Sequence, residues 1–552
     1  MRACWWLLVV SSLVQAQSLT RLENAQIITV DAAQPIAEAM VFDAEGRIVA
    51  VGERARLAAD WPQAQTLDGR GGTVVPGLID AHGHVLGLGL ALMRANLVDA
   101  QSKGEVIERL KAFAAQLPEG AWLLGRGWDQ NDWPEAEREF PTAADLDAAF
   151  PDRPVWLRRI DGHAGWANSA AMRLAKRDLS GDWQPDGGEI LRKDGKPTGV
   201  FIDSAMALID DAQPALDAPL RREALRRALR GLVAEGITGV HDAGVDKATL
   251  QAMAELADAE GLPLRIYAMA DGDGAALQAL CDDGLYRHAS GRLQMRAVKL
   301  YADGALGSRG ALLLADYSDA HGQRGLAVTS ADALEAAMQR ARRCGVQVAT
   351  HAIGDAANRR VLDLYARVLG NEHGSDHRWR IEHAQIVAPG DIPRFASLGV
   401  IASMQPTHAT SDMPWAEQRV GARRIVGGYA WRSFRDAGVR LALGSDFPVE
   451  ASDPQLGLHA SITRQDLAGQ PQGGWYAQQR LTAYEALRGF TLDAAYAAFD
   501  EARIGSLSPG KQADFVLLAR SPLRQYEGAK PENVVWATYV DGRAVYQALP
   551  SR

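Results

Sequence analysis

Cysteine is scarce in this chain of 552 residues, which contains only Cys4, Cys281 and Cys344. None of them stands in a C-x-x-C pair, the spacing typical of thiolate zinc sites and redox motifs. A scaffold held together by disulfides also uses more cysteines than these. We therefore expect Cys281 and Cys344 to be small core or surface residues, with neither a disulfide framework nor a cysteine-bound metal.

Concentrated blocks of Lys and Arg are also missing, and the formal net charge is −9. A basic segment at residues 220–232 alternates arginines with leucines and alanines, the pattern of an amphipathic helix with a solvated face. Proteins that bind a phosphate backbone usually carry a basic patch. We therefore expect a small-molecule substrate and no nucleic-acid partner. The sequence fixes no oligomeric state, and a homodimer is one alternative.

The N-terminus carries an apolar run that is too short to cross a bilayer of about 30 Å. The run follows Arg2 and ends at Val14-Gln15-Ala16, which is typical of a secretory signal and its small-x-small cleavage site. We expect residues 1–16 to be a signal peptide and the mature protein to be secreted or periplasmic, with no integral membrane span. A retained N-terminal anchor is the alternative.

Short strand-like segments separated by turns occupy both ends of the chain. They include "AQIITV" near the start and "ADFVLLA" near the end. Because the two terminal regions have the same character, they predict one small composite β-sandwich domain. It would be built from residues 17–75 and 505–552.

Between these ends, apolar strand-like runs alternate with helix-like segments. Seven such units lie between residues 237 and 448, and "TVVPGLIDAHGH", beginning at Thr73, supplies an eighth strand. Eight units predict an α/β chain with a (β/α)8 TIM-type barrel over residues 76–504. A doubly wound sheet is the alternative, but no Gly-x-Gly-x-x-Gly opening supports it.

The first and second predicted barrel strands are much farther apart than a βα loop of about 2–6 residues allows. Residues 98–215 therefore predict a lobe inserted between them. This lobe is rich in tryptophan and would form both a local core and an aromatic wall. Its tryptophans are Trp122, Trp128, Trp133, Trp156, Trp166 and Trp183.

Polar residues recur where the predicted barrel strands end, which is the end that carries the active site in TIM barrels. His82 and His84 are two positions apart, so both side chains point to the same side of their strand. Convergent imidazoles are typical of half a metal site. One such histidine is more often a core residue, but repetition on five strands predicts a metal site. Its candidate ligands are His82, His84, Lys299, His351, His383 and Asp446.

The ordered series Gly-Leu-Ile-Asp-Ala-His82-Gly-His84, Lys299, His351, His383 and Gly-Ser-Asp446 resembles the amidohydrolase superfamily over nearly the whole mature chain. The segments "GRGWDQNDW", "DGHAGWANS", "KLYADGALGSRG" and "THAIGDAANRRVL" are similar to its YtcJ-like branch, which includes N-substituted formamide deformylases. The resemblance implies a metal-dependent enzyme that hydrolyses a C–N amide-type bond, such as an N-acyl or formamide bond. An esterase or lactonase using the same site is one alternative, and a non-catalytic binding protein is another.

The resemblance also implies two divalent ions, with zinc as the default for such ligands. The more buried ion would be held by His82, His84 and Asp446, and the more exposed ion by His351 and His383.

In the same family pattern, Lys299 forms a carbamate that bridges the two ions. Asp446 takes a proton from the attacking water and passes it to the leaving nitrogen. A salt bridge from Lys299 to Asp303, with a single metal, is the alternative.

Further residues near predicted strand ends are candidates for substrate contacts. Arg309 could clamp a carboxylate with its planar fork, with a structural salt bridge as the alternative. His163 and His241 follow apolar runs and could instead be core residues. As the resemblance to this branch suggests, Trp128 and Trp133 could close an apolar pocket over the metals, with packing inside the lobe as the alternative. The tentative set is Trp128, His163, His241, Arg309 and His408.

Overall fold

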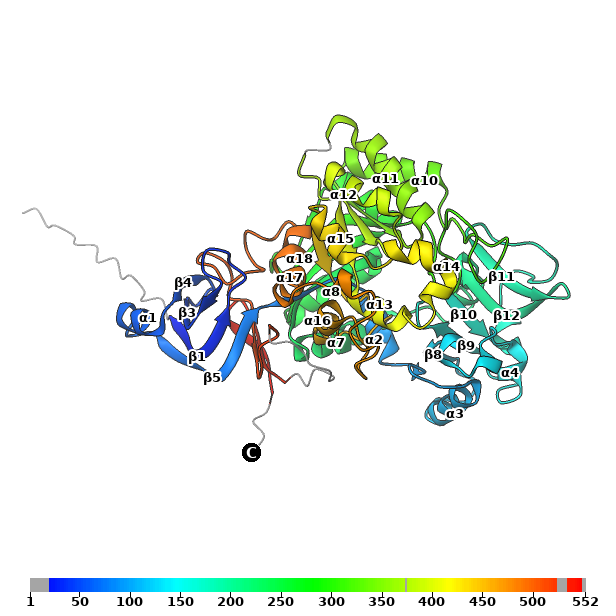
Figure 1. Cartoon of the computed structure of the whole chain (residues 1–552). Helices are drawn as coiled ribbons and strands as arrows, with labels where there is room; N and C mark the ends of the chain where they lie inside the picture. Colours follow the sequence, from blue (N-terminus) through cyan, green and yellow to red (C-terminus); the bar gives the residue numbers. More distant parts are fainter. Residues whose placement is uncertain (1–18, 373–374, 524–533, 549–552) are drawn as a thin grey trace, which may run out of the picture.

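The computed structural model describes residues 19–372, 375–523 and 534–548. Figure 1 shows a small β domain on one side, a helix-covered barrel in the middle and an inserted lobe on the other side. The expected signal peptide, residues 1–16, lies outside the described residues. No described helix is long and apolar enough to cross a membrane.

A mixed sheet made from both ends of the chain forms the β domain. Its strands follow the order β23-β22-β21-β5-β1-β3-β4, with β2 beside β1, so the two ends join in one continuous sheet. Strand β5 lies parallel to β1 and antiparallel to β21. The shared core contains Leu22, Phe42, Val74, Phe515 and Tyr539. The strands are β1 (Thr20–Ile28), β2 (Ile36–Ala37), β3 (Ala39–Phe42), β4 (Ile48–Gly52), β5 (Gln65–Pro76), β21 (Phe515–Leu518), β22 (Val535–Val540) and β23 (Arg543–Gln547).

Eight parallel strands form the barrel, in the order β20-β19-β18-β17-β16-β14-β13-β6, which confirms the predicted fold class. The seam between the first and last strands is joined by two hydrogen bonds, from Asp446 N to His82 O (2.7 Å) and from His84 N to Phe447 O (2.8 Å). The strands are β6 (Leu78–Gly83), β13 (Ile237–Val245), β14 (Arg265–Asp271), β16 (Leu293–Tyr301), β17 (Gln347–Ala352), β18 (Arg380–His383), β19 (Ile401–Met404) and β20 (Leu441–Leu443).

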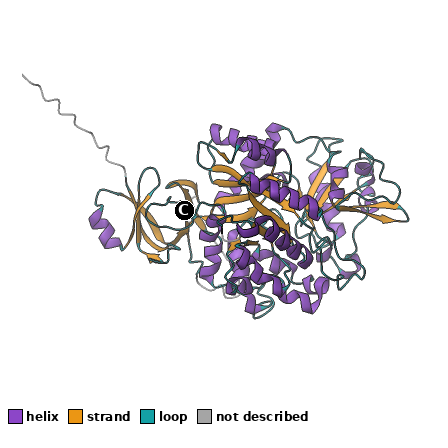
Figure 2. Ribbon diagram, turned by 90° about the horizontal axis from the view of Figure 1, so that it is seen from above, coloured by secondary structure: helices purple, strands orange, loops and turns teal. Residues whose placement is uncertain are grey.

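Helices cover the outside of this sheet, as Figure 2 shows from above. Local sequence sets where several of them begin, because side chains of Asp217, Asp246 and Ser330 accept hydrogen bonds from the first free backbone N–H groups. The main covering helices are α7 (Ala218–Ala234), α8 (Lys247–Ala259), α9 (Ala275–Asp283), α10 (Ala331–Arg343), α11 (Asp355–Leu369), α12 (Ile392–Leu398), α15 (Trp431–Asp436), α17 (Ala483–Gly489) and α18 (Leu492–Ala497).

The lobe inserted between β6 and β13 has its own six-stranded sheet, in the order β11-β12-β10-β9-β8-β7. Its core packs Trp128 against Trp133 and Trp166, with ring centroids 6.2 and 5.9 Å apart. The elements are β7 (Ala95–Asn96), α3 (Lys103–Ala114), β8 (Leu123–Trp128), α4 (Ala143–Asp147), β9 (Val155–Arg159), β10 (Ala164–Ala167), α5 (Ser169–Met172), β11 (Gly188–Lys193) and β12 (Lys196–Asp203).

One expectation about cysteine is wrong, because Cys281 and Cys344 form a disulfide with their Cα atoms 5.0 Å apart. Cys281 lies in α9 and Cys344 follows α10, and these helices flank the fourth barrel strand, β16, in the chain. Helices on either side of one strand of a βα barrel lie next to each other. Two cysteines that are far apart in sequence therefore meet on the barrel surface, and no local sequence motif predicts their pairing.

Candidate metal centre

Six side chains from five barrel strands converge at one end of the barrel. His82, Lys299, His351 and His383 lie in β6, β16, β17 and β18, while His84 and Asp446 follow β6 and β20. All of them except His84 are buried. These are the residues that the sequence singled out as ligands, and the register of a parallel barrel brings their strand ends to the same place.

Asp446 is at the centre of this cluster. One carboxylate oxygen, Oδ1, lies 3.0 Å from His84 Nε2 and 3.6 Å from His82 Nε2. The other, Oδ2, lies 3.8 Å from His408 Nε2 and 4.0 Å from His383 Nδ1. Asp446 therefore belongs to two candidate ligand groups, one with His82 and His84 and one with His383 and His408, each with its ligand atoms within 4.8 Å of one another.

Lys299 and His351 complete the cluster from neighbouring strands. The Lys299 ammonium nitrogen lies 2.9 Å from His82 Nε2. The His351 ring lies 4.6 Å from the His383 ring, measured between centroids. Asp303 instead accepts three backbone N–H groups, from Leu312, Ile353 and Gly354. Among the described residues, Asp303 forms no ion pair with Lys299, so the salt-bridge alternative for that lysine is not what the structure contains.

The donor atoms of this cluster fit a divalent metal. Buried polar atoms almost always have a hydrogen-bond partner. Here His351 Nε2 and His408 Nε2 are buried and have none. Asp446 Oδ1 is also buried, and His84 Nε2 is 3.0 Å from it. Imidazole nitrogens and a carboxylate oxygen are the donors that zinc and its neighbours in the first transition row prefer.

The protonation of the cluster also suits a metal, which binds neutral imidazole and ionised carboxylate. Burial, with Lys299 nearby, lowers the pKa of His82 to about 4, and burial lowers the pKa of His351 and His383 well below the usual value. Burial would raise the pKa of Asp446, but a hydrogen bond from His84 and the surrounding histidines hold it well below its ordinary range.

A buried pair that the sequence reasoning missed orients His82. Its Nδ1 lies 2.5 Å from Glu382 Oε2, and Arg380 donates to both oxygens of Glu382 at 2.5 and 2.8 Å. Arg380 also donates to His241 Nδ1 (2.8 Å) and to Ser403 Oγ (2.7 Å). The signal was present in "RWRIEH", because two charged residues at alternate positions of an otherwise buried strand require partners inside the barrel.

Replacing Glu382 with Gln should weaken metal binding by about 10- to 100-fold, because a carboxylate behind a metal-binding histidine fixes its ring and raises its basicity. Titration of the metal-free variant with zinc, followed by calorimetry, measures this change. The matched control is Glu485→Gln, since Glu485 pairs with Arg432 outside the cluster. An affinity equal to that of the unmodified protein would contradict the orienting role.

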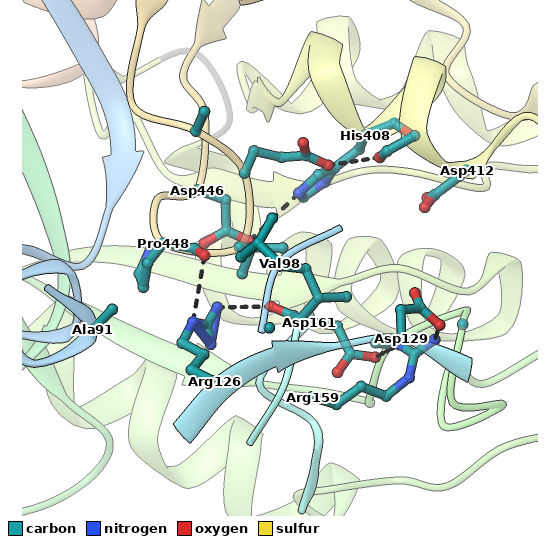
Figure 3. A pocket seen from close by; sticks show the side chains of 18 of the residues that line it. Ala91, Val98, Arg126, Asp129, Arg159, Asp161, His408, Asp412, Asp446 and Pro448 are labelled. Carbon is teal, nitrogen blue, oxygen red and sulfur yellow. Dashed lines mark hydrogen bonds and ion pairs between the residues drawn. The ribbon is translucent and has the colours of Figure 1, made fainter. Parts of the chain in front are cut away.

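A cavity of about 1040 Å³ opens above the cluster, between the barrel and the lobe (Figure 3). His351, His383, His408 and Asp446 lie in its lining. The lobe contributes mainly polar and charged side chains to this lining. They are Asp99, Gln101, Arg126, Asp129, Asp132, Arg159, Asp161 and His163.

The tentative substrate residues fall into two groups. His163 and His408 line the cavity. His163 lies 2.6 Å from Asp203, and although burial alone would lower the pKa of His163, the hydrogen bond and charge of Asp203 raise it to about 9.

The other three tentative residues do not line the cavity. Trp128 is 0% exposed and donates to Leu157 O in the lobe core, so its expected place over the metals is wrong. Trp133 is in the same core. His241 is buried beside Arg380, and Arg309 forms an ion pair with Asp319 at 3.0 Å. In each case the packing or pairing alternative explains the residue.

A comparison with protein families matches residues 65–546 to the model described as "Amidohydrolase family". The chain belongs to this family. Among curated amidohydrolase relatives, the N-substituted formamide deformylase of Arthrobacter pascens is 32% identical over 96% of this chain and 98% of its own length. YtcJ of Bacillus subtilis (strain 168) is 30% identical over 92% of this chain and 96% of its own length. The protein LONG AFTER FAR-RED 3 of Arabidopsis thaliana is 35% identical over 95% and 91%.

Solved structures agree with this family membership. A metal-dependent hydrolase from Pyrococcus horikoshii superimposes with a TM-score of 0.74 at 28% identity, covering 93% of this chain and 99% of that one. The predicted resemblance to the YtcJ-like amidohydrolases is therefore confirmed, and the chain is a metal-dependent hydrolase of the amidohydrolase family.

Proposed function

We propose that this amidohydrolase cleaves a C–N amide-type bond, as in a formamide or an N-acyl amine, with water as the co-substrate. The observation that carries the proposal is the cluster of buried ligand atoms in the lining of a large cavity, where His351 Nε2 and His408 Nε2 have no hydrogen-bond partner and the Asp446 carboxylate lies among the histidines. The relative named an N-substituted formamide deformylase, matched over nearly its whole length, supports this bond type.

In this proposal two ions, with zinc as the first choice, are held at the cluster. His82, His84 and Asp446 would hold one of them, and His351 and His383 the other. The chemistry supplied by bound divalent metal is polarisation of the carbonyl and a water whose pKa falls toward about 7. The neutral imidazoles and the ionised Asp446 are already in the forms that such binding requires.

Asp446 moves the proton in the proposed reaction. Its carboxylate is ionised, buried and in contact with the ligand cluster, so it can accept a proton from the attacking water. It then delivers that proton to the nitrogen of the breaking C–N bond. Water and the amide become a carboxylic acid and an amine, or formic acid and an amine for a formamide.

Lys299 is proposed to be carbamylated. Burial lowers the pKa of its ammonium to about 8, which increases the fraction of neutral amine that can attack carbon dioxide. The ammonium first loses one proton, and the neutral amine then adds to carbon dioxide to form a carbamate with release of a second proton. The change turns a buried cation into an anion, which two nearby divalent cations would stabilise. Growth with ¹³C-labelled bicarbonate should give a carbamate signal by NMR, and its absence from the unmodified protein would overturn the assignment. The Lys299→Met variant is the control and should lack the signal.

The proposed function is tested with a panel of formamides, N-acyl amines and cyclic amides, together with matched esters and lactones. We expect the metal-loaded protein to hydrolyse at least one amide class with a higher kcat/KM than the matched ester. An esterase or lactonase at the same site predicts the reverse order. If neither amides nor esters react, the hydrolytic proposal is wrong and the binding-protein alternative gains support.

The protein is further proposed to act in the periplasm or outside the cell. The signal-like residues 1–16 support this, and so does the disulfide between Cys281 and Cys344, because disulfides persist mainly in oxidising compartments. Fractionation of cells that express the full chain should find the mature protein, lacking residues 1–16, outside the cytoplasm. Recovery of uncleaved protein from the cytoplasm would contradict the proposal.

A further inference from the structure

Two arginines on the wall of the cavity lack a carboxylate partner. Arg94, between α2 (Val85–Ala91) and β7, forms no side-chain hydrogen bond or ion pair with any described residue. Arg126, in β8, forms hydrogen bonds only with backbone carbonyl groups among the described residues. Both side chains line the cavity and are half-buried. A half-buried guanidinium without an anion is unusual, because burying an unpaired charge is costly.

Other arginines in this region are paired. Arg159 forms ion pairs with Asp161 (2.6 Å) and with Asp129, and Arg158 pairs with Asp210 at 2.7 Å. Burial, together with the positive charge of Arg158, lowers the pKa of both Arg94 and Arg126 to about 10, so both remain charged at neutral pH. Neither Arg94 nor Arg126 forms an ion pair with a described residue, although Asp210 acts on the charge of Arg94, and Asp161 and Asp446 act on that of Arg126, without direct contact.

The position of Arg126 relates this charge to the reacting centre. Its Nη2 donates to Ile160 O (2.7 Å) and its Nε donates to Pro448 O (3.3 Å). Pro448 is two residues beyond Asp446, and Figure 3 shows the guanidinium beside the loop that carries both. The two carbonyl groups fix the orientation of the side chain, while Nη1 forms no hydrogen bond with a described residue. An anion on Arg126 would therefore lie next to the bond that is cleaved.

Carboxylates elsewhere in the cavity do not supply the missing partner. Asp412 accepts hydrogen bonds from Gln385 (2.8 Å) and Tyr429 (2.6 Å), and burial raises its pKa to about 7. Glu450 accepts from Ser411 at 2.6 Å, and burial raises the pKa of its carboxyl group too. Both carboxylates are satisfied by other donors and form no ion pair with Arg126 among the described residues, so they leave its guanidinium available to a ligand.

Some exposed residues of the cavity lining are apolar. Leu92, Val98 and Leu467 line the cavity and are 55%, 39% and 45% exposed, beside the exposed polar residues Asp99 and Gln101. Exposed apolar side chains in a cavity lining are typical of contact with an apolar part of a ligand. Trp128 and Trp133, which the sequence suggested for an apolar pocket, are buried in the lobe core and are not available.

We propose that Arg126, with Arg94 beside it, binds a carboxylate group of the substrate next to the scissile bond, and that the rest of the substrate is apolar and extends to the exposed apolar side chains of the lining. This inference rests on the proposed amide hydrolysis and narrows its substrates to N-acyl or N-formyl amino acids with apolar groups. Arg126 acts in specificity, since it recognises the substrate without taking part in bond cleavage.

The test compares each carboxylate ligand with its neutral twin. N-formyl-leucine and N-benzoylglycine are paired with the corresponding carboxamides, which keep the same scissile bond. For the metal-loaded protein we expect a kcat/KM about 10- to 100-fold higher for the acid, the range typical of a charge-assisted hydrogen bond. Calorimetry of the same four compounds measures binding whether or not any of them turns over.

Arg126→Gln should remove the preference for the acid in both measurements, Arg126→Lys should restore part of it, and Arg94→Gln should reduce it. Because the Gln variant loses hydrogen bonds to two carbonyl groups, its melting temperature is compared with that of Arg173→Gln, a variant of an exposed lobe arginine that donates to Pro151 O. If Arg126→Gln fails to fold, Arg94→Gln provides the test, because the Arg94 side chain forms no hydrogen bond with a described residue. A reduced preference for the acid in this variant supports the inference, and an unchanged preference contradicts it.

The inference is overturned if the unmodified protein binds and hydrolyses the carboxamides as well as the acids. It is also overturned if Arg126→Gln weakens both members of a pair equally. If the protein hydrolyses neutral formamides and does not prefer the acids to their carboxamides, this inference is overturned and the proposed function stays intact. If no compound reacts but the acids bind in an Arg126-dependent way, the proposed reaction is wrong and the carboxylate site is supported.

Discussion

Replacing Asp446 with Asn should lower kcat/KM by about 10² to 10⁴-fold, the range that a positioned general acid and base contributes. Asn is the appropriate replacement because Asp446 has a φ of 64°, a conformation that Asn tolerates better than most side chains. The amide keeps an oxygen that can contact a metal but cannot accept and return a proton. Steady-state kinetics at saturating zinc measures the loss, and metal analysis of the same sample shows whether the ions remain.

The matched control is Asp391→Asn. Asp391 is also a buried carboxylate, but it pairs with Arg359 and Arg394 away from the cavity. We expect this variant to keep its kcat/KM within a few-fold, even if its melting temperature falls. Near-normal turnover of Asp446→Asn with its metal retained would show that another group moves the proton.

Removal of the metal by dialysis against a chelator should abolish turnover, with a loss of about 10³-fold or more, because polarising a carbonyl is worth several kcal/mol. Activity should return on addition of zinc, cobalt or manganese, since the ligand set suits all three. The melting temperature should also rise on reconstitution, because a ligand that binds only the folded state stabilises it, by about 2.7 kcal/mol at a hundredfold excess over Kd.

Histidine variants provide the controls for this experiment. His351→Asn should retain fewer ions per chain than the unmodified protein, because it removes a buried ligand atom that has no hydrogen-bond partner. His288→Asn should behave like the unmodified protein, because His288 pairs with Asp258, away from the candidate ligand groups. Full activity of the chelated protein would contradict the requirement for a metal.

The sequence predicted the barrel and the convergence of its polar strand ends because these depend on local patterns. An apolar run followed by His351 or His383 places the histidine at a strand end, and parallel strands then bring those ends together. The split β domain could be anticipated because its two terminal segments resemble each other in turn-rich strand pattern. In these cases the information is short-range and repeated along the chain.

Other features depended on contacts that local patterns do not encode. The pairing of Cys281 with Cys344 follows from the neighbourhood of two helices, not from sequence spacing. Trp128 was expected over the metals, but the lobe has its own sheet, which needs a core. The sequence predicted no role for Arg126, because the absence of an ion pair can be recognised only when the positions of the neighbouring carboxylates are known.

The seam of the barrel has a consequence for how the enzyme is assembled. His82 and Asp446, which occupy the two sides of that seam, come from opposite ends of the barrel sequence, and the backbone of one is hydrogen-bonded to the backbone of the other. An incomplete chain, such as one still emerging from the ribosome or a proteolytic fragment ending before Asp446, lacks one wall of the ligand cluster. The complete set of metal ligands therefore exists only after the barrel has closed, and a metal bound by residues on both sides of the seam would stabilise the closed barrel.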